Sequence, residues 1–120
     1  MTDRDHLEPA DGRGAVPAED LEALLKTAFG LEAFRPLQAE VCRSVIEGRD
    51  ALLVMPTGAG KSLCYQLPGL ARGGTTLVLS PLIALMEDQV AALVGRGLKA
   101  ERIHSGRDRA DSRSVCRSYL

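Results

Sequence analysis

The stretch LLVMPTGAGKSLCYQ, residues 52–66, decides the fold because it joins an apolar run to a helical pattern through a glycine-containing turn. The apolar run 51–55 is bounded by turn residues, which is typical of a strand buried on both faces of a sheet. Gly58 and Gly60 allow the backbone to curl so that successive N–H groups converge on an anion. The helix that follows directs its positive end at the same point. The stretch therefore predicts a phosphate-binding loop between a strand and a helix.

Two residues at the end of this loop carry its chemistry. The strict phosphate-loop pattern is G-x-x-x-x-G-K-[ST], and the chain departs from it only at Met55, which stands in the place of the first glycine. Lys61 supplies a full positive charge for the β- and γ-phosphates, and the Ser62 hydroxyl is a ligand for the Mg²⁺ that bridges those oxygens. Lys61 is the predicted catalytic residue. The predicted nucleotide-binding residues of the loop are Thr57, Gly58, Ala59, Gly60, Lys61 and Ser62.

The remaining sequence alternates between helical and strand patterns. Helices are predicted over 19–30, from Pro36 to about Gly48, from about Gly60 to a kink or end at Pro68, from Pro81 to 94, and over 109–120. Strands are predicted over 51–55, 75–80 and 100–105. This alternation implies right-handed crossovers and an α/β fold with a parallel sheet, whose carboxyl edge would carry the strand-to-helix turns.

Composition limits the class of protein. The chain has 120 residues and 45% hydrophobic residues, which is normal for a globular domain. It has no apolar run approaching the ~20 residues of a membrane span and no secretory leader, so we expect a cytoplasmic protein that does not bind a membrane. No two of the three cysteines are spaced as zinc ligands, and their number is odd, which argues against a zinc site or a disulfide framework.

Charge is unevenly distributed along the chain. Residues 1–20 hold two basic and six acidic side chains, whereas residues 96–120 hold seven basic and three acidic ones. A basic end can mark nucleic-acid contact, although a solvated face is the common alternative. The chain has only two Phe and two Tyr residues, too few for a module that holds single strands by stacking bases.

Gln38 is a polar residue in the first turn of a mostly apolar helix face, on the same stripe as Cys42 and Ile46. A glutamine amide can pair with N6 and N7 of adenine through one acceptor and one donor. Taken alone, such a residue is more often solvated or bonded to backbone.

Three segments together resemble the RecQ family of DNA helicases: FRPLQ at 34–38, MPTGAGKSLCYQLP at 55–68 and LVLSPLIALMEDQV at 77–90. The resemblance implies a RecA-like P-loop NTPase domain that uses ATP and Mg²⁺ and unwinds DNA in the 3′ to 5′ direction. It assigns adenine recognition to Arg35 and Gln38 and apolar packing against adenine to Leu31. It also implies that three residues lie along a single DNA strand: Ser80, Pro81 and Leu82.

The chain lacks several parts of that family. No acidic D-E-x-H motif is present to complete the Mg²⁺ site and position water, and the chain ends at Leu120 within a predicted helix. We therefore expect a flexible tail over 1–17 and, over 18–120, an incomplete N-terminal part of the ATP-binding domain of a longer helicase. Protein partners cannot be predicted from these features.

Two other functions are compatible with the phosphate loop. One is a small P-loop phosphotransferase, against which the segments at 34–38 and 80–90 argue. The other is a non-catalytic module that binds a nucleotide or DNA at this length.

Overall fold

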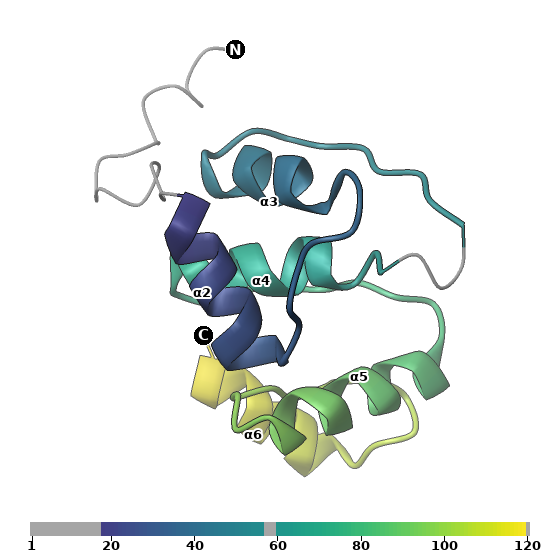
Figure 1. Ribbon diagram of the computed structural model, residues 1–120. Coiled ribbons are helices and arrows are strands. Elements are labelled where there is room, and N and C mark those ends of the chain that lie inside the picture. Colours follow the sequence, from purple (N-terminus) through teal and green to yellow (C-terminus); the bar gives the residue numbers. More distant parts are fainter. Residues whose placement is uncertain (1–17, 57–59, 120) are drawn as a thin grey trace. The chain divides into compact units, whose positions relative to one another are not determined.

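The computed structural model describes residues 18–56 and 60–119, which include five α-helices (Figure 1). These helices are α2 (Ala18–Phe29), α3 (Gln38–Ile46), α4 (Leu63–Arg72), α5 (Ile83–Gly95) and α6 (Arg109–Tyr119). They fall into two compact units, Met1–Thr76 and Leu77–Leu120. The predicted tail over 1–17 and three predicted loop residues, Thr57, Gly58 and Ala59, lie outside the described residues. None of the described helices is long and apolar enough to cross a membrane.

The first unit has a small apolar core around α4, which packs against both α2 and α3 (Figure 1). Each helix contributes residues spaced four apart, and such residues share one face of a helix. The buried hydrophobic side chains are Leu21, Leu25 and Phe29 of α2, Cys42 and Ile46 of α3, and Leu63, Cys64 and Leu67 of α4. This core fixes the ends of α3 and α4 that hold the predicted nucleotide-binding residues.

Helix α2 lies where the sequence predicts it, but α3 begins two residues later than expected. Pro36 lies in a turn, and the residue before the helix, Leu37, has φ 74° and ψ −19°. A left-handed backbone cannot continue a right-handed helix, so α3 begins at Gln38. The buried face of α3 consists of Gln38, Cys42 and Ile46. The sequence pattern also aligns Leu37, Val41 and Val45 as the main apolar stripe, but Leu37 is 58% exposed and the two valines are only half-buried.

Helix α4 begins at Leu63 rather than near Gly60, and it continues through Pro68 to Arg72. Of the two outcomes expected at Pro68, a kink or an end, the helix end does not occur there. Pro68 is fully buried against the other helices of the unit, and this packing offsets the hydrogen bond that proline cannot donate.

In the second unit α5 begins at Ile83, so Ser80 is not its N-cap and Pro81 is not its first residue. The N-cap is Leu82, whose N–H donates to the Ser80 hydroxyl at 3.2 Å. This local bond holds Ser80 and Leu82 in a turn ahead of the helix, because a serine side chain competes with the helix for backbone donors. Helix α6 lies where the sequence predicts it.

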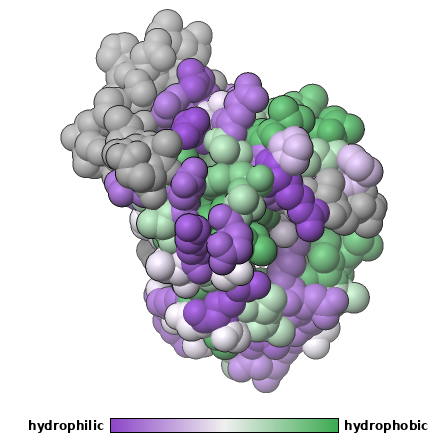
Figure 2. Space-filling model, in the orientation of Figure 1, coloured by the Kyte–Doolittle hydropathy of each residue, from purple (hydrophilic) through white to green (hydrophobic). Residues whose placement is uncertain are grey.

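The predicted parallel sheet is not formed by the described residues, in which no segment is a strand. Residues 51–56 and 75–80 are irregular, and so are residues 100–104, with a turn at 105. A parallel strand is stable only when neighbours on both sides use its backbone groups and cover its two faces. Here the apolar side chains are exposed, with Leu52 at 92% and Leu79 at 86%. Figure 2 shows hydrophobic surface over the segment that follows α3.

Candidate functional site

Gln38 lies at the centre of the candidate site in the first unit. Its side-chain Oε1 accepts a hydrogen bond from the Arg35 N–H at 2.7 Å, and its Nε2 donates to the Gly60 carbonyl at 3.0 Å. Gln38 is a buried polar residue, with only 3% of its surface exposed. The amide therefore ties the turn before α3 to the end of the predicted phosphate loop.

Gly60 fits this arrangement because it has no side chain. Its φ is +86°, a conformation that L side chains rarely adopt. A Cβ placed on Gly60 would lie 2.4 Å from Gln38 Nε2 and 3.7 Å from Arg35 Nη1. Three predicted site residues thus converge at one point: Arg35 and Gln38, which are neighbours in the sequence, and Gly60, which lies 22 positions after Gln38.

Lys61 and Ser62 follow directly. The Lys61 ammonium donates to the Met55 carbonyl at 3.0 Å and is otherwise exposed, so it folds back towards the residue before the loop. Ser62 is the N-cap of α4, and its hydroxyl makes no capping hydrogen bond. A hydroxyl that is not used for capping fits the predicted role as a ligand of a hard cation, which prefers oxygen donors.

Leu31 comes just after α2, and 44% of its surface is exposed. The chain turns here, because the N–H groups of Gly30 and Leu31 donate to carbonyls of the last turns of α2. An apolar side chain with this exposure is available to contact an apolar ligand.

The predicted DNA-contact residues, Ser80, Pro81 and Leu82, lie in the second unit. Pro81 is exposed and Leu82 is 59% exposed. The Ser80 hydroxyl accepts the Leu82 N–H, so its oxygen has a local role while its own O–H is a further donor.

Two buried free thiols, Cys42 of α3 and Cys64 of α4, belong to the core next to the candidate site. Burial raises the pKa of Cys42 to about 12, with a further contribution from the neighbouring Cys64 thiol. Burial also raises the pKa of Cys64. The Cys42 thiol donates weakly to the Leu63 carbonyl at 4.0 Å. These two cysteines are buried in α3 and α4, and both are held as neutral thiols.

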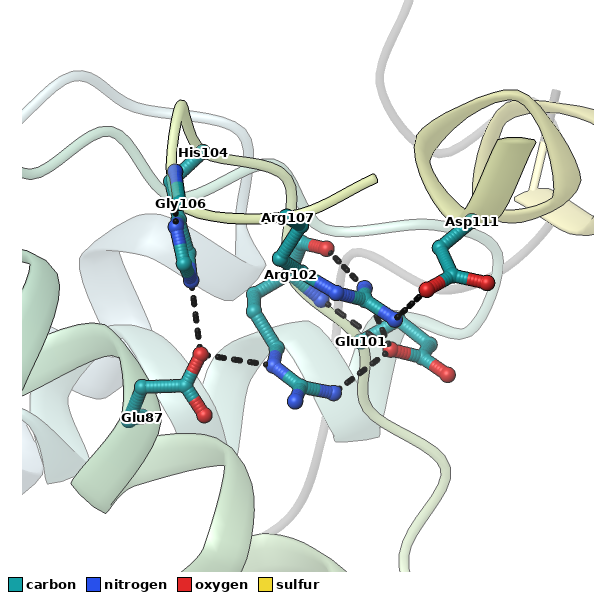
Figure 3. Close-up of polar contacts among 7 residues, drawn as sticks. All are labelled: Glu87, Glu101, Arg102, His104, Gly106, Arg107 and Asp111. Carbon is teal, nitrogen blue, oxygen red and sulfur yellow. Dashed lines mark hydrogen bonds and ion pairs between the residues drawn. The ribbon is translucent and has the colours of Figure 1, made fainter. Parts of the chain in front are cut away.

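The second unit contains a polar network that sequence reasoning did not find (Figure 3). Glu87 of α5 accepts hydrogen bonds from Arg102 Nε at 2.9 Å and from His104 Nε2 at 2.6 Å. The Arg102 bond, and then the His104 bond, lower the pKa of Glu87 to about 2. No sequence pattern pointed to this cluster, because its members are 15 and 17 residues apart and meet only through the tertiary path.

The histidine ring is held at both nitrogens. Its Nδ1 accepts the Gly106 N–H at 3.1 Å, which leaves Nε2 to carry the proton that it donates to Glu87. Gly106 suits this contact, since a Cβ there would lie 3.1 Å from His104 Nδ1. With both nitrogens occupied, His104 fixes the turn at 104–107 and has no free nitrogen for proton transfer.

Comparison with known proteins identifies the family. The family model described as DEAD/DEAH box helicase matches residues 35–118, which is well over half of the chain. The chain belongs to the DEAD/DEAH box helicase family. The match begins at Arg35 and contains both Gln38 and the loop that ends in Lys61 and Ser62.

Curated members similar to this chain are RecQ-type helicases. The ATP-dependent DNA helicase RecQ of Haemophilus influenzae is 52% identical over 83 residues, which cover 69% of this chain and 13% of that protein. The protein of the same name from Synechocystis is 46% identical over 97 residues, covering 81% of this chain and 20% of that protein. The ATP-dependent DNA helicase Q1 of Rattus norvegicus is 51% identical over 82 residues.

These matches confirm the predicted RecQ-family resemblance. The chain spans only about a fifth or less of the length of these relatives. The DEAD/DEAH box match supports the predicted RecA-like P-loop class, although the described residues contain no strand of the expected sheet. Among the described residues no group of three or more His, Cys, Asp or Glu side chains could hold a metal ion.

Proposed function

We propose that residues 18–120 are the N-terminal part of the ATP-binding domain of a RecQ-like, ATP-dependent 3′ to 5′ DNA helicase. The observation that carries this proposal is the double hydrogen bond of Gln38, which joins Arg35 to Gly60 of the phosphate loop. The family match and the names of the similar proteins support it. A cytoplasmic location and a DNA substrate belong to the same proposal.

The Gln38 amide has enough bonding capacity to read a base while it holds the loop. Its oxygen has two lone pairs and its nitrogen two hydrogens, and each atom uses only one in the bonds to Arg35 and Gly60. The second lone pair and the second hydrogen match N6 and N7 of adenine. Because only 3% of Gln38 is exposed in this structure, the amide would have to become accessible for a base to pair with it. Binding of adenine would therefore be coupled to the position of Gly60 through one side chain. Leu31 would add apolar contact with the base.

Lys61 supplies charge for the triphosphate. In this structure its ammonium donates to the Met55 carbonyl, and the arrival of the β- and γ-phosphates would exchange that neutral acceptor for a charged one. A hydrogen bond to a charged group contributes roughly 1.5–3 kcal/mol, which is more than a neutral bond contributes. Lys61 therefore moves from closing the loop to holding the nucleotide.

Ser62 is the residue that would hold Mg²⁺, because its hydroxyl lies at the start of α4 and makes no capping bond. Mg²⁺ held by this hydroxyl would supply positive charge that offsets the negative charge of the nucleotide phosphates. Hydrolysis needs, in addition, a group that positions water, and the sequence contains no D-E-x-H motif for that task. We therefore expect the 120-residue chain to bind ATP weakly and to release no phosphate, with or without single-stranded DNA.

The segment at Ser80, Pro81 and Leu82 is the proposed contact with a DNA strand. Pro81 and Leu82 are exposed, Ser80 is half-buried, and the segment leads directly into α5, whose first N–H groups have no partner within the helix. Such N–H groups suit a backbone phosphate, so the contact would position a strand without reading its sequence.

Base selectivity tests the proposal. Gln38→Ala in the 120-residue chain should weaken competition by ATP against a fluorescent ATP analogue more than competition by GTP, because guanine offers O6 where adenine offers its N6 donor. Gln89→Ala on α5 is the matched control and should leave both unchanged. An equal loss for both nucleotides would remove Gln38 from base recognition, and strong phosphate release by the wild-type chain would mean that the 120 residues hold a complete hydrolytic site.

The non-catalytic alternative makes a different prediction for a longer protein that contains this chain. If the chain belongs to a motor, single-stranded DNA should stimulate phosphate release by that protein, and Lys61→Ala should abolish the stimulation. Nucleotide binding without any DNA-stimulated turnover in that protein would favour a binding module.

A further inference from the structure

Helix α6 of the second unit displays three arginines on one stripe, Arg109, Arg113 and Arg117. They are spaced four residues apart, so they follow one side of the helix with about 6 Å between successive residues. All three are exposed. Another side of α6 lines a cavity of about 300 Å³ within this unit, and Val115 and Tyr119 belong to that side. None of the three arginines lines this cavity.

These arginines differ from the other arginines nearby in having no carboxylate partner. Arg102 is bonded to Glu87 and Glu101, and Arg107 is bonded to Glu101 and faces Asp111 at 3.9 Å (Figure 3). Within the part of the chain that the structure describes, the arginine stripe of α6 forms no ion pair. The acidic side chains of this region are thus used by other residues, and the positive charge of the stripe is left uncompensated.

The position of Arg109 strengthens this contrast. It lies in the first turn of α6, where the helix dipole makes a cation unfavourable. Asp108 occupies a different role there, because its carboxylate accepts the Ala110 N–H at 3.1 Å. Three unpaired arginines in a row, one of them against the dipole, are best stabilised by an external anion with repeated charges.

We propose that the stripe formed by Arg109, Arg113 and Arg117 binds the phosphate backbone of a DNA single strand. Guanidinium groups make forked, charge-assisted hydrogen bonds to phosphate oxygens, and a flexible strand can align successive phosphates with charges that follow one side of a helix. The stripe contains no aromatic residue, so the contact is with phosphates and not with bases. The choice of DNA rests on the proposed function, whereas the stripe itself rests on the described charges.

The salt dependence of binding measures the number of phosphate contacts. For single strands each neutralised phosphate adds roughly 0.7 to the slope of log affinity against log salt concentration, so three contacts should contribute a slope of about 2. Loss of a single accidental contact would change the slope by much less.

The test uses the 120-residue chain and a fluorescein-labelled oligothymidylate, with anisotropy measured over a range of NaCl concentrations. The test variant carries Arg109→Gln, Arg113→Gln and Arg117→Gln. The matched control carries Lys26→Gln, Arg43→Gln and Arg49→Gln, three exposed residues of the first unit, and lowers the net charge equally. We expect the slope of log affinity against log salt concentration to fall by about 2 in the test variant and to stay at the wild-type value in the control. A variant with Arg→Lys at all three positions of the stripe should retain most of the binding. Circular dichroism verifies that each variant keeps its helices.

Several results would overturn the proposal. These are equal loss in test and control variants, no binding of oligothymidylate by the wild type at low salt, tighter binding of duplex DNA through the same residues, or equal binding of a polyglutamate peptide. ATP binding measured on the same proteins separates this proposal from the proposed function. The stripe variants should bind ATP as the wild type does, so a failure of nucleotide binding in all proteins would count against the helicase assignment alone.

Discussion

The Gln38 side chain and the Gly60 backbone share a hydrogen bond of 3.0 Å that joins α3 to the end of the phosphate loop. The two residues are 22 positions apart, and Gly60 leaves no room for a Cβ beside the amide. Since Gln38 is almost fully buried, the loop is held from the protein interior and not by a surface contact. This relationship makes the position of the loop sensitive to changes at either residue.

Gly60→Ala should therefore disturb the site. The new Cβ would meet Gln38 Nε2 at 2.4 Å, and the φ of +86° would strain any L side chain. Strain of this kind costs on the order of 1–3 kcal/mol, so we expect a lower thermal midpoint and weaker ATP binding. Gly95→Ala is the control, because a Cβ there meets nothing within 4 Å and its φ is ordinary. Equal effects of the two substitutions would show that the contact with Gln38 is unimportant.

Among the described residues, Leu37 is the non-glycine residue with a positive φ, which is 74°. Its side chain is 58% exposed, so replacing it loses little burial. The left-handed conformation costs a leucine about 1–2 kcal/mol, whereas glycine adopts it freely. Glycine, however, loses more conformational entropy on folding, which costs about 0.5–1 kcal/mol. Leu37→Gly should raise the free energy of unfolding by up to about 1 kcal/mol in urea titrations. Leu37→Val should lower it, and a stabilising valine would contradict the described backbone.

The helices were predictable from the sequence because their apolar residues recur at helical spacing, as Leu21, Leu25 and Phe29 do in α2. Helix starts were less predictable. Pro36 and Pro81 both fit a first helical position, yet the left-handed Leu37 and the Ser80–Leu82 bond move the two starts further along the chain. Local patterns do not contain such competing contacts.

The strand predictions are not confirmed by the described residues, for a different reason. The runs 51–55 and 75–80 have strand composition, but a parallel ladder depends on neighbours that are distant in the sequence. At the candidate site, the loop pattern and the family resemblance named Arg35, Gln38 and Gly60, which the structure brings together. The bonds of Glu87 to Arg102 and His104 had no counterpart in any motif, since only the tertiary path brings these residues into contact.

The thiols should differ in reactivity. Only the thiolate reacts with iodoacetamide, and a pKa of about 12 leaves roughly one Cys42 in ten thousand ionised at pH 8. Burial shields Cys64 as well, whereas Cys116 is exposed. Peptide mapping by mass spectrometry should therefore find Cys116 modified first, with Cys42 and Cys64 modified only after urea is added. Equal labelling of all three in the native chain would contradict the described core.

Glu87 should make stability depend on pH in the acid range. Its pKa falls from 4.5 to about 2 in the folded chain, because Arg102 and His104 donate hydrogen bonds to it. The unfolded chain therefore takes up this proton first as the pH falls, and the stabilisation present above about pH 4.5 is lost as the pH approaches 2. The effect is reduced by solvent, since 41% of the Glu87 side chain is exposed.

Thermal midpoints of the wild type and Glu87→Gln, measured between neutral pH and pH 2, test this dependence. The wild type should be more stable near neutral pH, and the difference should vanish towards pH 2. Glu22→Gln on α2 serves as a control because Glu22 is an exposed carboxylate of the other unit. If Glu87→Gln kept the full pH dependence of the wild type, another carboxylate would be responsible.

The central claim is that this chain binds ATP through the loop that ends in Lys61, and equilibrium titration with a fluorescent ATP analogue in the presence of Mg²⁺ tests it most directly. One charge-assisted bond contributes roughly 1.5–3 kcal/mol, so Lys61→Ala should weaken binding by about tenfold or more. Lys26→Ala, which removes an exposed charge from α2, should leave binding unchanged. Weak binding by the wild type that is lost only in Lys61→Ala is the predicted result. Binding of equal strength by the wild type and both variants, or no binding by any of them, would contradict the account.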